Sequence, residues 1–110
     1  MKHKVSAKKL SDILFEISKE KNLLDEVNRS VVEFNRVLKI NRDLRSFLQS
    51  KRYSRDEKFG ILRETFGSSI NEVVLVVSSY VSGAKAINII GHIRKNFIGK
   101  YKNEKNIVSV

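Results

Sequence analysis

The segment over residues 70–83, INEVVLVVSSYVSG, limits the possible folds of this chain more than any other feature. It is the most apolar part of a charged sequence, and its valines give it strand propensity. However, Ser69 and Glu72 have the spacing of a helix capping box, and Gly83 is a residue that commonly ends a helix. The segment is also shorter than the ~20 apolar residues of a membrane-spanning helix. We therefore predict a helix over about residues 70–82, not a strand or a membrane anchor.

This predicted helix is apolar on more than one side, because its apolar residues reach too far around it to form a single buried stripe. A helix of this kind either lies at the centre of a domain or binds a partner on its second face. The residues alone leave both interpretations open. The apolar residues are Val73, Val74, Leu75, Val76, Val77, Tyr80 and Val81.

Apolar residues at helical spacing predict five further helices. Asn22 separates the first two, Asn41 is placed to cap the third, and Ser54 with Glu57 forms a capping box for the fourth, which Gly67 ends. The chain has 110 residues, enough for one domain, and no proline. We predict an all-α six-helix bundle with a short extended tail at residues 106–110. Three of the five further helices cover about residues 6–21, 23–40 and 85–102. A short one follows Asn41, with Leu44, Phe47 and Leu48 facing inward, and another lies between its caps Ser54 and Gly67.

The composition argues against several kinds of chemistry. No cysteine is present, which removes disulfides and thiolate sites. The two histidines, His3 and His92, lie far apart in the sequence, which argues against a paired-histidine metal site. Acidic pairs such as Asp25–Glu26 stand where helix starts and surfaces are expected, and no glycine-rich phosphate loop occurs. We predict a non-enzyme with no catalytic residue, no cofactor and no metal.

The positive charge raises nucleic-acid binding as an alternative function. The formal net charge is +10, and no acidic residue occurs between Glu72 and Glu104. Phe97 and Tyr101 lie among basic residues there, as aromatic side chains do in many nucleic-acid-binding proteins. Their i, i+4 spacing is nevertheless more typical of a helix face in a core. We therefore favour a core position for both and keep a basic nucleic-acid-binding module as the alternative.

Five motifs occur in an order that resembles a known family. Residues 12–27 (DILFEISKEKNLLDEV) are similar to the opening Y-A-x-A-L-F-E-L-A type helix and leucine-rich second helix of the delta subunit of the rotary ATP synthase, called the oligomycin-sensitivity-conferring protein in mitochondria. Residues 41–48 (NRDLRSFL) resemble its N-P-E-L-R-x-x-L segment. Residues 54–67 resemble its S-x-x-E-K…I-L-x-x-x-F-G pattern. The last two motifs lie at residues 81–93 and 101–110.

The resemblance implies a domain assignment. In that family the N-terminal domain is a six-helix bundle, which agrees with the helices predicted from the residues. Residues 1–105 would form this domain, and residues 106–110 would begin the linker to a C-terminal domain absent from this chain. The chain is then expected to be part of a longer protein.

The resemblance also implies a function without an active site. The domain would cap the catalytic head by binding alpha-subunit N-terminal helices in a groove between its first and fifth helices. The missing domain would join the b subunit of the peripheral stalk. The subunit would lie on the cytoplasmic side of the inner (plasma) membrane without inserting into it, and nucleic acid is not expected as a partner. The implied groove residues are Leu10, Ile13, Leu14, Ile17, Val76, Ser79 and Tyr80. For Leu14, Ile17 and Tyr80, a position in the core is an equally open interpretation.

Two of these residues depart from the family pattern. Leu10 replaces a common tyrosine, and Ile13 replaces an alanine. Such a groove is expected to suit a matching partner helix. An aspartate at either position is expected to abolish partner binding while leaving the domain folded.

Overall fold

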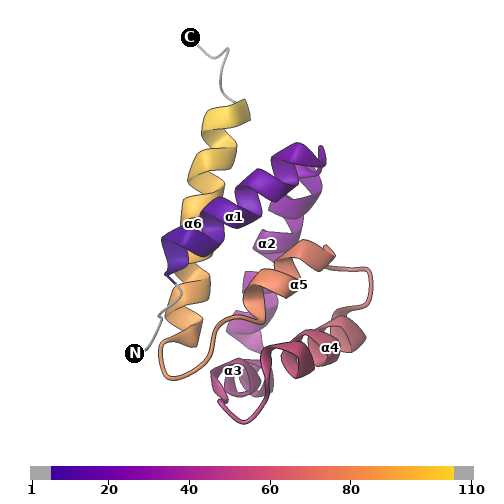
Figure 1. Ribbon diagram of the computed structural model, residues 1–110, viewed down its shortest axis with the longest axis vertical. Helices are drawn as coiled ribbons and strands as arrows, with labels where there is room; N and C mark the ends of the chain where they lie inside the picture. The colour runs from indigo at the N-terminus through magenta and orange to yellow at the C-terminus, as the bar shows by residue number, and fades with distance from the viewer. Residues whose placement is uncertain (1–5, 106–110) are drawn as a thin grey trace.

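The structure is a computed structural model that describes residues 6–105, and this part of the chain contains helices and no strand (Figure 1). The all-α prediction is confirmed. The predicted extended tail at residues 106–110 lies outside the described residues. The six helices are α1 (Ala7–Glu20), α2 (Leu24–Ile40), α3 (Arg42–Gln49), α4 (Arg55–Phe66), α5 (Glu72–Ser78) and α6 (Ala86–Lys105).

Two helices organise the bundle. α6 is the longest, and it packs against α1, α2 and α3. α5 packs against α1, α2 and α4, so it joins the outlying α4 to the rest of the domain. In Figure 1 α1 and α5 lie in front of α2, while α3 and α4 lie at the end of the molecule farthest from the C-terminal end of α6. The core contains buried residues from all six helices, including Leu14, Phe34, Leu48, Leu62, Leu75 and Phe97.

Most of the predicted helix boundaries follow local signals. Asn22 adopts φ = 60°, a left-handed conformation that asparagine tolerates better than most residues, and so separates α1 from α2. The side chain of Asn41 accepts a hydrogen bond of 2.9 Å from the N–H of Leu44 at the start of α3. Ser54 and Glu57 make both bonds of the capping box, and Gly67 ends α4 with φ = 57°.

The second predicted capping box is wrong. Asn71, not Ser69, caps α5, and its side chain accepts a hydrogen bond of 2.9 Å from the N–H of Val73. The hydroxyl of Ser69 instead donates to the carbonyl of Phe66 at 2.6 Å, at the end of α4. The helix therefore begins at Glu72.

The fifth helix is also shorter than the predicted span of 70–82, because α5 ends at Ser78. The chain then leaves the helical path before it reaches Gly83, which adopts φ = 84°. The N–H of Gly83 donates to the carbonyl of Gln49 at 2.8 Å, so this glycine ties the segment after α5 to the end of α3. Gly83 has the predicted conformation but does not end the helix.

The aromatic residues of α6 pack as core residues. Phe97 is fully buried and meets the ring of Phe15 edge-on, with ring centroids 5.9 Å apart. Tyr101 is half-buried, and its hydroxyl donates to the carboxylate of Asp25 at 2.6 Å. These contacts leave the face of Phe97 unavailable for stacking on a base, which favours the core interpretation of the sequence pattern.

Candidate functional site: an apolar surface on α1 and α5

A group of apolar side chains faces solvent on α1 and α5. Ile13 is 43% exposed and Tyr80, just after α5, is 45% exposed. Ile17 and Val76 lie one helical turn from them and are half-buried. We call these four residues the α1–α5 surface.

The spacing of residues explains this arrangement. On α1, Ile13 and Ile17 are four residues apart, so they lie on the same side of the helix. Leu10 and Leu14 have the same spacing but lie on the side that enters the core. Val76 belongs to α5, and Tyr80 lies in the turn after it, where its N–H donates to the carbonyl of Val77 at 3.2 Å. α5 packs directly against α1.

Three of the seven predicted groove residues are buried. Leu10 and Leu14 are 3% and 1% exposed and belong to the core. Ser79 is also buried, and its hydroxyl donates to the carbonyl of Val76 at 2.6 Å. An aspartate at position 10 is therefore expected to unfold the domain, because it would place a charge in the core. The expectation that this substitution would leave the domain folded does not fit the burial of Leu10.

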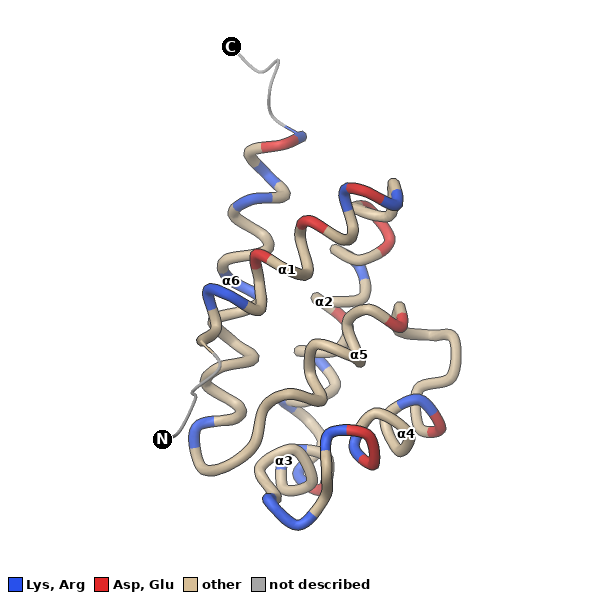
Figure 2. Tube along the Cα trace, in the orientation of Figure 1, with Lys and Arg blue, Asp and Glu red and all other residues tan. Residues whose placement is uncertain are grey.

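α5 itself contributes no charge to the surface beyond its first residue. Glu72 is the first residue of α5, and no lysine, arginine, aspartate or glutamate follows it in that helix. Figure 2 shows α5 as an uncharged segment beyond its first residue. Contacts with a partner on this side would therefore depend on apolar burial more than on charge.

Arg55 is a neighbour of the surface that the sequence analysis missed. Its guanidinium carbon lies 4.8 Å from the centre of the Tyr80 ring, a cation–π geometry. This contact holds the ring of Tyr80 against the start of α4. The two residues are 25 positions apart in the chain, and no local pattern marks such a pair.

Neither a metal-binding cluster nor a membrane-spanning helix occurs within residues 6–105. Within residues 6–105, no cluster of three or more histidine, aspartate or glutamate side chains is placed to hold a metal ion. In the same part of the chain, none of the helices has the length and apolar character needed to cross a membrane.

Comparison with known proteins places the chain in a family. The family model described as "ATP synthase delta (OSCP) subunit" matches residues 7–110. The chain belongs to this family. The resemblance noted in the sequence is thus confirmed.

Curated relatives of this family member include proteins named "ATP synthase subunit delta" from Bacillus thuringiensis (strain Al Hakam), Bacillus cereus (strain AH820) and Bacillus anthracis. Each is 28% identical over 107 residues, which cover 97% of this chain and 59% of the relative. The chain therefore spans about three fifths of the length of these relatives. No solved structure shows a significant match.

Proposed function

We propose that this chain is the N-terminal domain of a stator subunit of the rotary ATP synthase, without an active site of its own. The α1–α5 surface would bind an N-terminal helix of the alpha subunit and so cap the catalytic head. The observation that carries this proposal is the exposure of Ile13 on α1 and of Tyr80 just after α5, two helices that pack against each other in a delta-family chain. The C-terminal domain of the longer subunit would join the b subunit, on the cytoplasmic side of the membrane.

The chemistry of the surface suits an amphipathic helix. Such a helix presents apolar side chains at i, i+3, i+4 and i+7, which would lie along Ile13, Ile17, Val76 and Tyr80. Complete burial of one large apolar side chain stabilises a complex by roughly 1.5–3 kcal/mol. Ile13 and Tyr80 are already about half covered, so each has only part of this gain available.

The test is a calorimetric titration of the chain with a synthetic peptide of the alpha-subunit N-terminus, at low and high salt. We expect salt-insensitive binding with a negative heat-capacity change, because apolar surface is buried. Ile13→Asp should abolish binding while the far-ultraviolet circular dichroism and the thermal unfolding of the domain stay close to those of the wild type.

Val32→Asp is the matched control. Val32 is 45% exposed, close to the exposure of Ile13, but it lies on α2 and outside the α1–α5 surface. This variant should bind the peptide as the wild type does. If folded wild-type chain does not bind the peptide, or if both variants lose binding equally, the proposed surface is wrong.

The salt series also tests the nucleic-acid alternative. The affinity of a protein for nucleic-acid phosphates falls steeply as the salt concentration rises, because binding releases counterions from the nucleic acid. Tight, salt-sensitive binding to an oligonucleotide, with no binding to the peptide, would favour the alternative over the stator function.

A further inference from the structure

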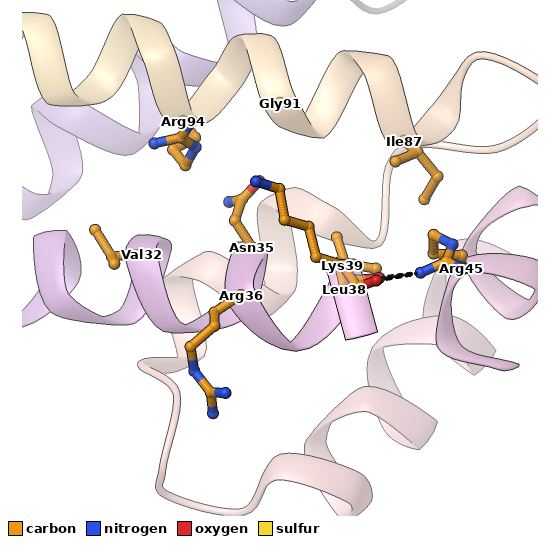
Figure 3. A pocket seen from close by; sticks show the side chains of 9 residues that line it. All are labelled: Val32, Asn35, Arg36, Leu38, Lys39, Arg45, Ile87, Gly91 and Arg94. Atoms are coloured by element: carbon orange, nitrogen blue, oxygen red, sulfur yellow. Dashed lines mark hydrogen bonds between the residues drawn. The ribbon is translucent and has the colours of Figure 1, made fainter. Parts of the chain in front are cut away.

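A cleft of about 490 Å³ lies between α2 and α6 and extends to α3 (Figure 3). The helices that form this cleft are not those that form the α1–α5 surface, so a function of the cleft would not depend on the stator function proposed above. The volume falls within the range typical of small-molecule sites, roughly 300–1,000 Å³. Its lining combines apolar side chains with cationic ones, and no aspartate or glutamate of residues 6–105 belongs to it.

Three cations surround the cleft from three helices. Lys39 comes from α2, Arg45 from α3 and Arg94 from α6. In Figure 3 the side chain of Lys39 extends from α2 toward α6. A fourth cation of the lining, Arg36, points away from α6 and is bound by Glu33 at 2.7 Å. Arg36 therefore differs from Lys39 in direction, and, within residues 6–105, in having a carboxylate partner.

Arg45 removes an obstacle to anion binding. The last carbonyls of a helix form the negative end of its dipole, and the end of α2 borders the cleft. One guanidinium nitrogen of Arg45 donates to the carbonyls of Leu38 and Lys39, at 2.7 Å each. The negative end of α2 is thereby neutralised by a cation that also lines the cleft.

The apolar part of the lining comes from both long helices. Val32 and Leu38 belong to α2 and Ile87 to α6. Leu38 is buried, Ile87 is half-buried, and Val32 is exposed. The cleft thus offers an apolar wall beside a group of positive charges, which is complementary to an anion with an apolar body.

Gly91 keeps the α6 side of the cleft open. A glycine inside a helix destabilises it by up to ~1 kcal/mol relative to alanine. A Cβ atom at this position would meet no atom within 4 Å, so close packing does not require the glycine. Gly60 and Gly99 have equally open surroundings, so a glycine alone assigns no site. At position 91, however, an added side chain would reduce the cleft itself.

From this arrangement we propose that the α2–α6 cleft binds a small organic anion that carries at least two negative charges on an apolar body. Aryl phosphates and aryl dicarboxylates share this chemistry. Lys39, Arg45 and Arg94 would pair with the anionic groups, and Val32 and Ile87 would contact the apolar body. The site goes beyond the stator function, since it needs no alpha-subunit helix.

The test is a titration of the isotope-labelled chain with 1-naphthyl phosphate, followed by backbone amide NMR. We expect saturable shifts centred on the amides of Asn35, Lys39, Ile87 and Gly91. Inorganic phosphate should bind at least roughly tenfold more weakly, because it has no apolar body to bury. A parallel titration with naphthalene dicarboxylate shows whether a phosphate group is preferred to two carboxylates.

Variants test the geometry of the site. Lys39→Gln should weaken binding roughly fivefold through the loss of a charge-assisted hydrogen bond. Arg29→Gln removes the same charge from an exposed position of α2 outside the lining of the cleft, and should leave binding unchanged. Gly91→Leu should abolish binding by filling the cleft, with thermal stability at or above that of the wild type. Gly91→Ala, which adds a single methyl group, should weaken binding less.

Three results would overturn the proposal. The first is the absence of saturable shifts. The second is a set of shifts centred on the lysines near the C-terminal end of α6. The third is an equal loss of binding in Lys39→Gln and Arg29→Gln, which would indicate a general attraction to positive charge.

Discussion

The polar contacts that hold α4 to the rest of the domain differ in kind from those that join α1 to α6. At the α4 end, the buried ammonium group of Lys58 donates to the carbonyls of Leu48 and Val81, at 2.8 Å each. Along the α1–α6 seam, by contrast, the links are partly exposed ion pairs. These join Asp12 to Lys100 and Lys19 to Glu104.

Buried polar contacts are expected to affect the stability of the domain more than exposed ion pairs do. Exposed ion pairs contribute little to stability, because water solvates both partners well when they separate. The two carbonyls at the α4 end are bound by a buried lysine, so its loss would leave buried acceptors without a donor. The seam rests on apolar packing around Phe97. Within residues 6–105, by contrast, a single buried side chain, Lys58, makes the hydrogen bonds from α4 to Leu48 of α3 and to Val81 after α5.

The largest expected effect is that of Lys58→Met. Two carbonyls would lose their donor, and relief from burying a charge would offset part of this loss. We expect the free energy of unfolding to fall by about 2 kcal/mol, as measured by urea denaturation. Lys95→Met, at an exposed position of α6, should change it by less than about 0.5 kcal/mol. If Lys58→Met is as stable as the wild type, the buried contacts of Lys58 contribute no more to stability than exposed polar contacts do.

Raising the pH is expected to change the free energy of unfolding by a smaller amount. Burial lowers the pKa of Lys58 below its ordinary value of 10.5. Between the lowered folded pKa and 10.5, the unfolded chain binds a proton that the folded chain does not, so this group makes folding more favourable as pH rises. The stability difference between wild type and Lys58→Met should therefore increase with pH in this window. A difference that stays constant would mean that the folded and unfolded pKa values are the same.

The smallest effect is expected from Tyr101→Phe, at the contact between α6 and the start of α2. The hydrogen bond from the Tyr101 hydroxyl, with that from Lys105, holds the pKa of Asp25 below its ordinary value of 3.8. Loss of the hydroxyl should move this pKa upward, as an NMR titration of the carboxyl carbon would show. The pKa of Asp12, lowered by Lys100 and Lys8, should not change and serves as the internal control. Because Asp25 is solvent-exposed, thermal stability near neutral pH should hardly change.

The capping motifs show what local sequence can and cannot predict. Ser54–Glu57 and Ser69–Glu72 have the same spacing, but only the first makes a capping box. Near the second, the N–H of Asn71 donates to the hydroxyl of Ser30 on α2, and Ile70 is buried. These tertiary contacts fix the chain at position 71, so the helix starts later than the local motif predicts.

The candidate sites show the same limit. The spacing of apolar residues predicted α1, but it could not tell that Leu10 and Leu14 enter the core while Ile13 remains exposed. The contact between Arg55 and Tyr80 depends on how α4 packs on α5. The α2–α6 cleft was missed entirely, because its lining residues come from three helices that are brought together only by the fold.

The length of α6 has a mechanical consequence. Its 20 residues form a rod about 30 Å long that contacts α1, α2 and α3. A pull on the C-terminal end of this rod, directed along its axis, would load these interfaces in shear and share the force among them at the same time. The same force applied across the axis would peel α6 away from its neighbours one turn after another. The domain is therefore built to resist tension along α6 better than tension across it.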